Sequence, residues 1–104
     1  MLKLKDIPNK EIIPGFNARF VHTETNTIGF VEIKAGGILP EHSHVHTQIT
    51  QVTEGKLALT INGKEEIYEP GMMAIIPSNV PHAAKAITDC KVTDIFSPAR
   101  EDYK

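Results

Sequence analysis

Apolar and polar residues alternate along short stretches of this chain, and turn residues separate one stretch from the next. A period of two places successive side chains on opposite faces, which is typical of half-buried β-strands. No stretch keeps the period of 3.6 that an amphipathic helix requires. The strand-like stretches are residues 16–22, 27–34, 47–53, 57–61, 64–68, 72–76, 83–87 and 91–96.

Glycine, proline and asparagine mark the turns between these stretches. Asn62 and Gly63 stand between two alternating stretches and predict a hairpin, because both accept the positive φ of a type I′ turn. Pro40 argues against a central strand at residues 38–41, which we expect to form a turn or an edge strand. Residues 1–15 carry three lysines and two prolines, so we expect an arm or an edge strand there.

Length and charge narrow the class of protein. With 104 residues and 40% hydrophobic content, residues 1–104 are expected to form a single all-β domain, a sandwich or a barrel. The net charge of −2 gives no electrostatic basis for binding nucleic acid or an anionic membrane. No stretch has the apolar length of a signal peptide or of a membrane span. Cys90 is the single cysteine and cannot form an internal disulfide, so we expect a reducing, cytoplasmic location and leave its role open.

Three of the five histidines lie within a few residues of one another, at His42, His44 and His46. In a strand, residues i and i+2 point to the same side, so the first two are predicted to face one interior point. Gln48 shares their parity, and His82 would reach the same point from another strand. Three imidazole nitrogens and one amide oxygen suit one divalent transition metal, such as Ni, Fe, Zn or Mn. A solvated histidine loop is the alternative, and His46 is either a fourth ligand or a rim residue.

The last strand-like stretch and the two arginines carry further candidates. Asp94 alternates with Val92 and Phe96, so on a buried face it would be a candidate acid or base, and on an exposed face an ordinary carboxylate. Arg100 is a natural anchor for a carboxylated ligand, because a guanidinium matches a carboxylate bidentately. Arg19 is either a surface charge or a second contact to such a ligand.

Two spacings in the chain resemble the motifs of the cupin family. The pattern G-x(5)-H-x-H-x(3)-Q-x(6)-G at residues 36–55 resembles the first cupin motif, and G-x(5)-P-x(4)-H within residues 71–86 resembles the second. The resemblance implies a conical β-barrel (a double-stranded β-helix or jelly roll), an interior metal ion and a homodimer. It assigns the metal to His42, His44, Gln48 and His82.

The chain departs from the cupin pattern at two positions. Asn79 replaces a usual glycine, a mild change because asparagine tolerates the left-handed backbone region. Gln48 replaces the usual metal-binding glutamate, so the four expected ligands are all neutral and leave the ion its formal 2+ charge. We expect weaker metal binding, a stronger Lewis acid and a preference for an anionic substrate.

The sequence DIFSPAREDY at residues 94–103, together with E-H-S-H…Q in the first motif, resembles the KdgF-type pectin-degradation cupins. That resemblance implies ring opening of 4,5-unsaturated monouronates, which come from pectin and alginate breakdown, to the linear 5-keto-4-deoxyuronate. It assigns catalytic or substrate-contacting roles to Asp94, Phe96 and Arg100, and we expect Arg19 to help Arg100 hold the carboxylate of the sugar. A cupin dioxygenase, an isomerase of another small substrate and a non-catalytic sugar-binding or sensor cupin remain as alternatives.

Overall fold

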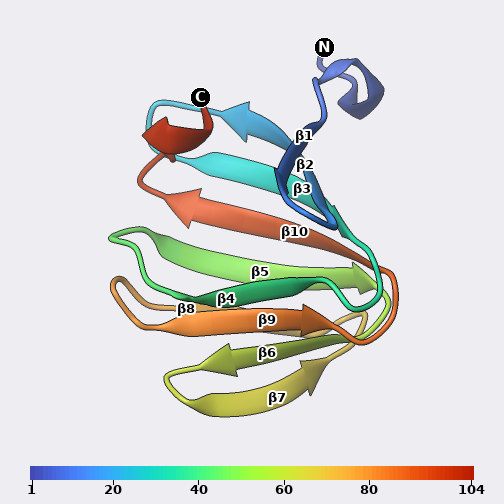
Figure 1. Cartoon of the computed structure of the whole chain (residues 1–104). Coiled ribbons are helices and arrows are strands. Elements are labelled where there is room, and N and C mark those ends of the chain that lie inside the picture. Colours follow the sequence, from blue (N-terminus) through green and yellow to red (C-terminus); the bar gives the residue numbers. More distant parts are fainter.

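The computed structural model describes all of residues 1–104 and contains ten β-strands and two short 3₁₀ turns (Figure 1). The turns, η1 (Leu4–Asp6) and η2 (Glu101–Tyr103), lie near the two ends of the chain. No helix has the length and apolar character needed to span a membrane. The strands are β1 (Lys10–Ile13), β2 (Phe16–His22), β3 (Thr27–Ile33), β4 (Ile38–His42), β5 (Thr47–Glu54), β6 (Leu57–Ile61), β7 (Lys64–Tyr68), β8 (Met73–Ile76), β9 (His82–Ala86) and β10 (Cys90–Ser97).

The strands form two antiparallel sheets that share one core, which confirms the all-β prediction. The six-stranded sheet has the order β1-β2-β3-β10-β5-β8, and the four-stranded sheet has the order β4-β9-β6-β7. Alternate residues of both sheets point inward, so Val52 and Ile76 of one sheet join Leu57 of the other in a single apolar cluster. Cys90 is a buried member of that cluster.

The turns follow the sequence prediction. Strands β6 and β7 pair from Ile61 opposite Lys64, so Asn62 and Gly63 alone make the connection. Both have positive φ, 50° and 81°, as a type I′ turn requires. Asn79 also lies in the left-handed region, with φ of 64°, so the residue that departs from the cupin pattern keeps the backbone conformation a glycine would allow.

Both predicted edge segments lie at sheet edges. Strand β4, which contains Pro40, is the outer strand of the four-stranded sheet, and its pairing with β9 shifts register between Leu39 and His42. Strand β1 is the outer strand of the six-stranded sheet. Proline is tolerated at an edge because the missing N–H costs no ladder hydrogen bond there.

Strand β10 lies between β3 and β5, and alternate side chains along it point into the core. Val92 and Phe96 are each 4% exposed, and Asp94 lies between them on the same inward face. The register with β5 sets Asp94 opposite Thr50 and Phe96 opposite Gln48. The sequence left open whether Asp94 lies on a buried or an exposed face, and in the structure it lies on the inner face.

Gly55 and Gly36 provide a matched test of how the first motif is built. Both have left-handed φ, 85° and 83°, but a Cβ on Gly55 would overlap the carbonyl oxygen of Asp89, whereas a Cβ on Gly36 would meet no atom within 4 Å. Gly36→Ala should lower the free energy of unfolding by about 1 kcal/mol, the cost of the backbone conformation alone. Gly55→Ala should lower it by about 3 kcal/mol or more, because overpacking is added. Urea unfolding of both variants in chelator checks this, and equal losses would contradict it.

Candidate metal centre

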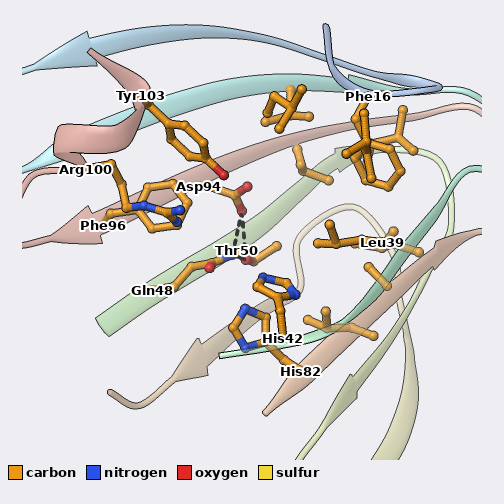
Figure 2. Close-up of a pocket in the computed structure, with 18 of the residues that line it drawn as sticks. Phe16, Leu39, His42, Gln48, Thr50, His82, Asp94, Phe96, Arg100 and Tyr103 are labelled. Atoms are coloured by element: carbon orange, nitrogen blue, oxygen red, sulfur yellow. Dashed lines mark hydrogen bonds between the residues drawn. The ribbon is translucent and has the colours of Figure 1, made fainter. Parts of the chain in front are cut away.

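A cavity of about 80 Å³ lies between the two sheets and is lined by 19 residues, of which 13 are hydrophobic. The six polar ones gather at one end, where they point toward one another (Figure 2). Four come from β5 and β10 of the six-stranded sheet or follow β10, and the other two come from β4 and β9 of the four-stranded sheet. The polar lining residues are His42, Gln48, Thr50, His82, Asp94 and Arg100.

Three histidines form a compact cluster beside this cavity. His42 ends β4 and pairs with His82 at the start of β9, and their ring centroids are 4.2 Å apart. His44 lies in the bend after β4, with its ring centroid 4.8 Å from that of His82. One nitrogen from each ring can be chosen so that all three lie within 4.8 Å of one another. The predicted convergence is present, but a bend rather than strand alternation carries His44 to it.

The hydrogen bonds of the three rings leave one lone pair on each directed away from the backbone. Every Nδ1 lies within 3.0 Å of a carbonyl oxygen, which can only accept, so each Nδ1 donates and each Nε2 keeps a lone pair. The Nε2 of His82 is buried and has no hydrogen-bond partner. An unsatisfied buried acceptor is costly unless something binds it. The carbonyls are those of Pro40 for His42, His46 for His44 and Val80 for His82.

Gln48 adds a fourth candidate metal ligand, its amide oxygen, to this cluster. Its Nε2 donates to the Thr50 hydroxyl at 2.9 Å and to the Asp94 carboxylate at 3.3 Å, which turns Oε1 toward His44. That Oε1 lies 3.1 Å from the His44 Nε2. Two lone pairs facing each other at this distance repel, and a cation held by both removes the repulsion. Three imidazoles and one amide oxygen therefore fit a divalent transition metal.

Burial favours the neutral, metal-binding form of two of the histidines. Loss of hydration lowers the pKa of His44, and the positive charge of Arg100 lowers it further. Loss of hydration is also the main cause that lowers the pKa of His82, against the hydrogen bond to the Val80 carbonyl. Because a metal ion displaces the proton of an imidazolium, a lowered pKa removes part of that competition near neutral pH.

Asp94 is the one carboxylate of the cavity. Its oxygen accepts hydrogen bonds from the Thr50 hydroxyl at 2.8 Å and from the Gln48 amide at 3.3 Å. Burial raises the pKa of Asp94 from 3.8 to about 6, although the two hydrogen bonds and the charge of Arg100 oppose the shift. A carboxyl group with such a pKa can take up and release a proton near neutral pH.

Arg100 reaches the cavity from the segment after β10. Its guanidinium lies over the ring of Phe96, 4.8 Å from the centroid, and over that of Tyr103 at 4.1 Å (Figure 2). Its Nε and Nη2 donate to the two oxygens of Asp102 at 2.9 Å and 2.7 Å. The side chain is thus packed against two aromatic rings and held along one edge by Asp102, which leaves its other edge open to a ligand.

Two other predicted residues lie outside the cluster. The ring of His46 lies 5.4 Å from that of His44 and 6.4 Å from that of Phe96, and its buried Nδ1 has no hydrogen-bond partner. Arg19 alternates with the fully buried Ala18 on β2, so it points to the outer face and lines a separate surface groove. The structure does not bring Arg19 to the cavity, and the strand alternation that the sequence itself displays is the reason.

Several residues of the site were missed from the sequence. Thr50 shares the strand parity of Gln48, so parity was a usable signal for it. Asp102, Tyr103 and Phe20 gave no such signal, because they meet only through the return of the C-terminal turn η2 onto β2.

Residues 29–96, well over half of the chain, match the family described as the cupin domain. The structure of KdgF from Halomonas sp. is similar, with 27% identity, a TM-score of 0.91, and coverage of 96% of this chain and 94% of that one. An RmlC-like cupin from Shewanella frigidimarina NCIMB 400 is similar too, with 25% identity, a TM-score of 0.92 and coverage of 96% and 91%.

A larger protein also shares the fold. Salicylate 1,2-dioxygenase from Pseudaminobacter salicylatoxidans has 26% identity and a TM-score of 0.78, and the match covers 82% of this chain but 27% of the dioxygenase. No curated protein sequence matches this chain significantly. Altogether 405 solved chains match. The fold is therefore too widely shared to select a reaction, and the residues of the cavity must do so.

Removal of a clustered histidine should abolish tight metal binding. His82→Ala is expected to weaken Zn²⁺ binding by at least about 100-fold, because loss of a partner that only supports a ligand already costs about 10–100-fold. Isothermal titration calorimetry measures the affinity. His22→Ala is the matched control, because His22 lies outside the cluster and bonds to Thr27. Unchanged affinity in His82→Ala would overturn the assignment, and a similar loss in His46→Ala would add His46 to the ligands.

The raised pKa of Asp94 predicts that the metal-free protein loses stability as the pH rises. In the folded state Asp94 keeps its proton up to about pH 6, whereas in the unfolded chain it releases the proton near pH 3.8. The stability that protonation contributes is therefore complete below about pH 4 and is lost as the pH rises to about 6. Asp94→Asn should raise the free energy of unfolding at pH 8 by about 1–3 kcal/mol and leave it nearly unchanged at pH 4. Urea unfolding in chelator measures both. Asp6→Asn, at an exposed position, is the control, and a loss of stability at pH 8 in Asp94→Asn would contradict the prediction.

Proposed function

The chain belongs to the cupin domain family, and from this premise we propose that it is a metal-dependent enzyme that opens the ring of 4,5-unsaturated monouronates. One observation carries the proposal. Histidines placed to hold a metal ion and a half-buried carboxylate with a raised pKa lie at the same cavity, with a buried arginine beside them. The similarity to KdgF from Halomonas sp. over nearly the whole of both chains supports the same choice.

The proposed reaction is an isomerisation in which atoms balance without a second reactant. The substrate is a cyclic hemiacetal with a double bond between C4 and C5, and C5 carries the carboxylate. Loss of the proton from the hydroxyl on C1 breaks the bond between C1 and the ring oxygen and leaves an aldehyde. The ring oxygen stays on C5 as an enolate, and a proton added at C4 converts it to the 5-ketone.

The chain supplies a group for each requirement of this reaction. Asp94 accepts the proton of the C1 hydroxyl and returns a proton to C4, which its pKa of about 6 permits near neutrality. Arg100 holds the carboxylate through the guanidinium edge that Asp102 leaves free. Phe96 covers the substrate ring and excludes water from it. A divalent ion held by His42, His44, Gln48 and His82 would stabilise negative charge on substrate oxygens.

A dioxygenase acting on a small aromatic carboxylate is the second candidate. The mostly apolar lining of the cavity favours it, since 13 of the 19 lining residues are hydrophobic. The similarity to salicylate 1,2-dioxygenase points the same way. Such an enzyme needs a redox metal such as Fe(II) and consumes O₂, whereas ring opening of a uronate needs neither.

The homodimer implied by the cupin resemblance is part of the proposal. Met73 and Ile75 are 57% and 68% exposed on the outward face of β8, where they are open to a second copy of the chain. Half-buried apolar side chains from β3, β5 and β10 lie on the same outward face: Ile28, Phe30, Ile49 and Ile95.

Loss of ultraviolet absorbance tests the reaction directly, because the double bond conjugated with the carboxylate absorbs and the linear product does not. Metal-loaded protein should remove the signal well above the spontaneous rate, and chelation should stop it. Asp94→Asn should lower kcat by at least about 100-fold, the usual contribution of a positioned acid or base. Asp6→Asn serves as the control, because Asp6 lies in η1 and does not line the cavity.

A flat trace from the metal-loaded protein would overturn the ring-opening function. Oxygen uptake with Fe(II) and an aromatic carboxylate would then support the dioxygenase. Saturable binding of a uronate without conversion would instead identify a sensor.

A further inference from the structure

We propose that the hydroxyl of Tyr103 contacts the substrate and donates a hydrogen bond to the ring oxygen as that oxygen becomes negatively charged. The inference rests on the proposed function, which it deepens by adding a residue to the reacting groups. Tyr103 lines the cavity, and its hydroxyl points toward the carboxylate of Asp94 (Figure 2).

The ring of Tyr103 is clamped in place by neighbours from three parts of the chain. Phe20 of β2 stacks on it, with ring centroids 4.5 Å apart and planes 22° from parallel. The Arg100 guanidinium covers it at 4.1 Å from the ring centroid. The Lys10 ammonium of β1 donates to the Tyr103 carbonyl at 3.0 Å and fastens the turn η2. A side chain held in this way aims its hydroxyl with little freedom, as a group that acts on a substrate requires.

The neighbouring strand β3 leaves space for the Phe20 ring that stacks on Tyr103. Gly29 lies opposite Phe20 in the pairing of β2 with β3. A Cβ at Gly29 would come within 3.0 Å of the Phe20 ring, so any larger residue would displace the ring on which Tyr103 stacks.

The hydrogen of the Tyr103 hydroxyl is free to be donated. The hydrogen bond with Lys10 uses the Tyr103 backbone carbonyl, and in the one with Arg100 the Tyr103 hydroxyl oxygen accepts. The guanidinium beside the phenol can only donate, so it cannot accept that hydrogen. Burial raises the pKa of Tyr103, mainly through lost hydration, and the phenol therefore stays protonated.

The position of Tyr103 beside Arg100 determines which substrate atom its hydroxyl is expected to contact. In an unsaturated uronate the carboxylate and the ring oxygen are both bonded to C5. If Arg100 holds the carboxylate, the ring oxygen lies next to it. The orientation that we propose for the sugar places this oxygen on the side where the Tyr103 ring packs against the guanidinium. Negative charge develops on this oxygen when its bond to C1 breaks, and a preorganised donor stabilises such charge more in the transition state than in the ground state.

Tyr103→Phe removes only the hydroxyl and keeps the ring that packs on Phe20 and Arg100. In Zn²⁺-loaded protein it should lower kcat for the unsaturated monouronate by about 100–1,000-fold. KM should change less than threefold and the melting temperature should not change. Tyr68→Phe, at the only other tyrosine, is the matched control and should react like the parent. A Tyr103→Phe variant with parental kcat would overturn the inference while leaving the proposed function intact.

A spectroscopic measurement tests the contact without turnover. The chain has two tyrosines and no tryptophan, so in Tyr68→Phe the ultraviolet difference spectrum reports Tyr103 alone. Galacturonate added to the Zn²⁺-loaded Tyr68→Phe variant should perturb that spectrum with saturation. If the parent fails to open the ring but the spectrum responds, the proposed reaction is wrong and the Tyr103 contact stands. Absence of any perturbation would overturn the contact.

Discussion

The hydrogen bonds that join Gln48, Thr50 and Asp94 are the constraint on which the site depends. These polar side chains lie in a mostly apolar interior, where an unpaired donor or acceptor is costly. Antiparallel pairing sets Asp94 directly opposite Thr50, and both the Thr50 hydroxyl and the Gln48 amide donate to it. Because these bonds use the amide nitrogen of Gln48, its oxygen must face His44. One amide group therefore connects the Asp94 carboxylate to the histidine cluster.

A glutamate at position 48 could not make this connection. It has no hydrogen to donate, and its negative charge would lie beside that of Asp94, which would raise the pKa of one of the two carboxyl groups strongly. Glutamine lacks the attraction that a carboxylate has for the metal, but its amide N–H stabilises the ionised form of Asp94. The same choice leaves the ion its full formal charge, which suits an anionic substrate better than a site with an acidic ligand would.

The two walls of the cavity have different origins. The histidines and Gln48 are carried by β4, β5, β9 and the bend after β4, which strand pairing holds in register. Arg100 and Tyr103 come from the short segment after β10, which is fixed by stacking on Phe20, by the Lys10 contact and by the backbone N–H of Arg100, which donates to the buried Thr27 hydroxyl. A substrate between these walls would meet a rigid metal-binding side and a side built from aromatic and guanidinium faces (Figure 2).

Features set by neighbouring residues were predictable from the sequence. The period of two gave the strands, Asn62-Gly63 gave the hairpin and Pro40 gave the edge strand. Each follows from local backbone geometry, which a few residues determine. The histidine spacing indicated the cluster, but the pairing of β4 with β9 is what brings His82 to His42. The conical closure of the sheets stays a prediction. Only the tertiary structure decided that Asp94 faces inward, that Arg19 faces outward and that Tyr103 joins the site. Those outcomes depend on the pairing of β10 with β5 and on the return of the C-terminal turn onto β2, and contacts between residues so far apart leave no periodic signal in the chain.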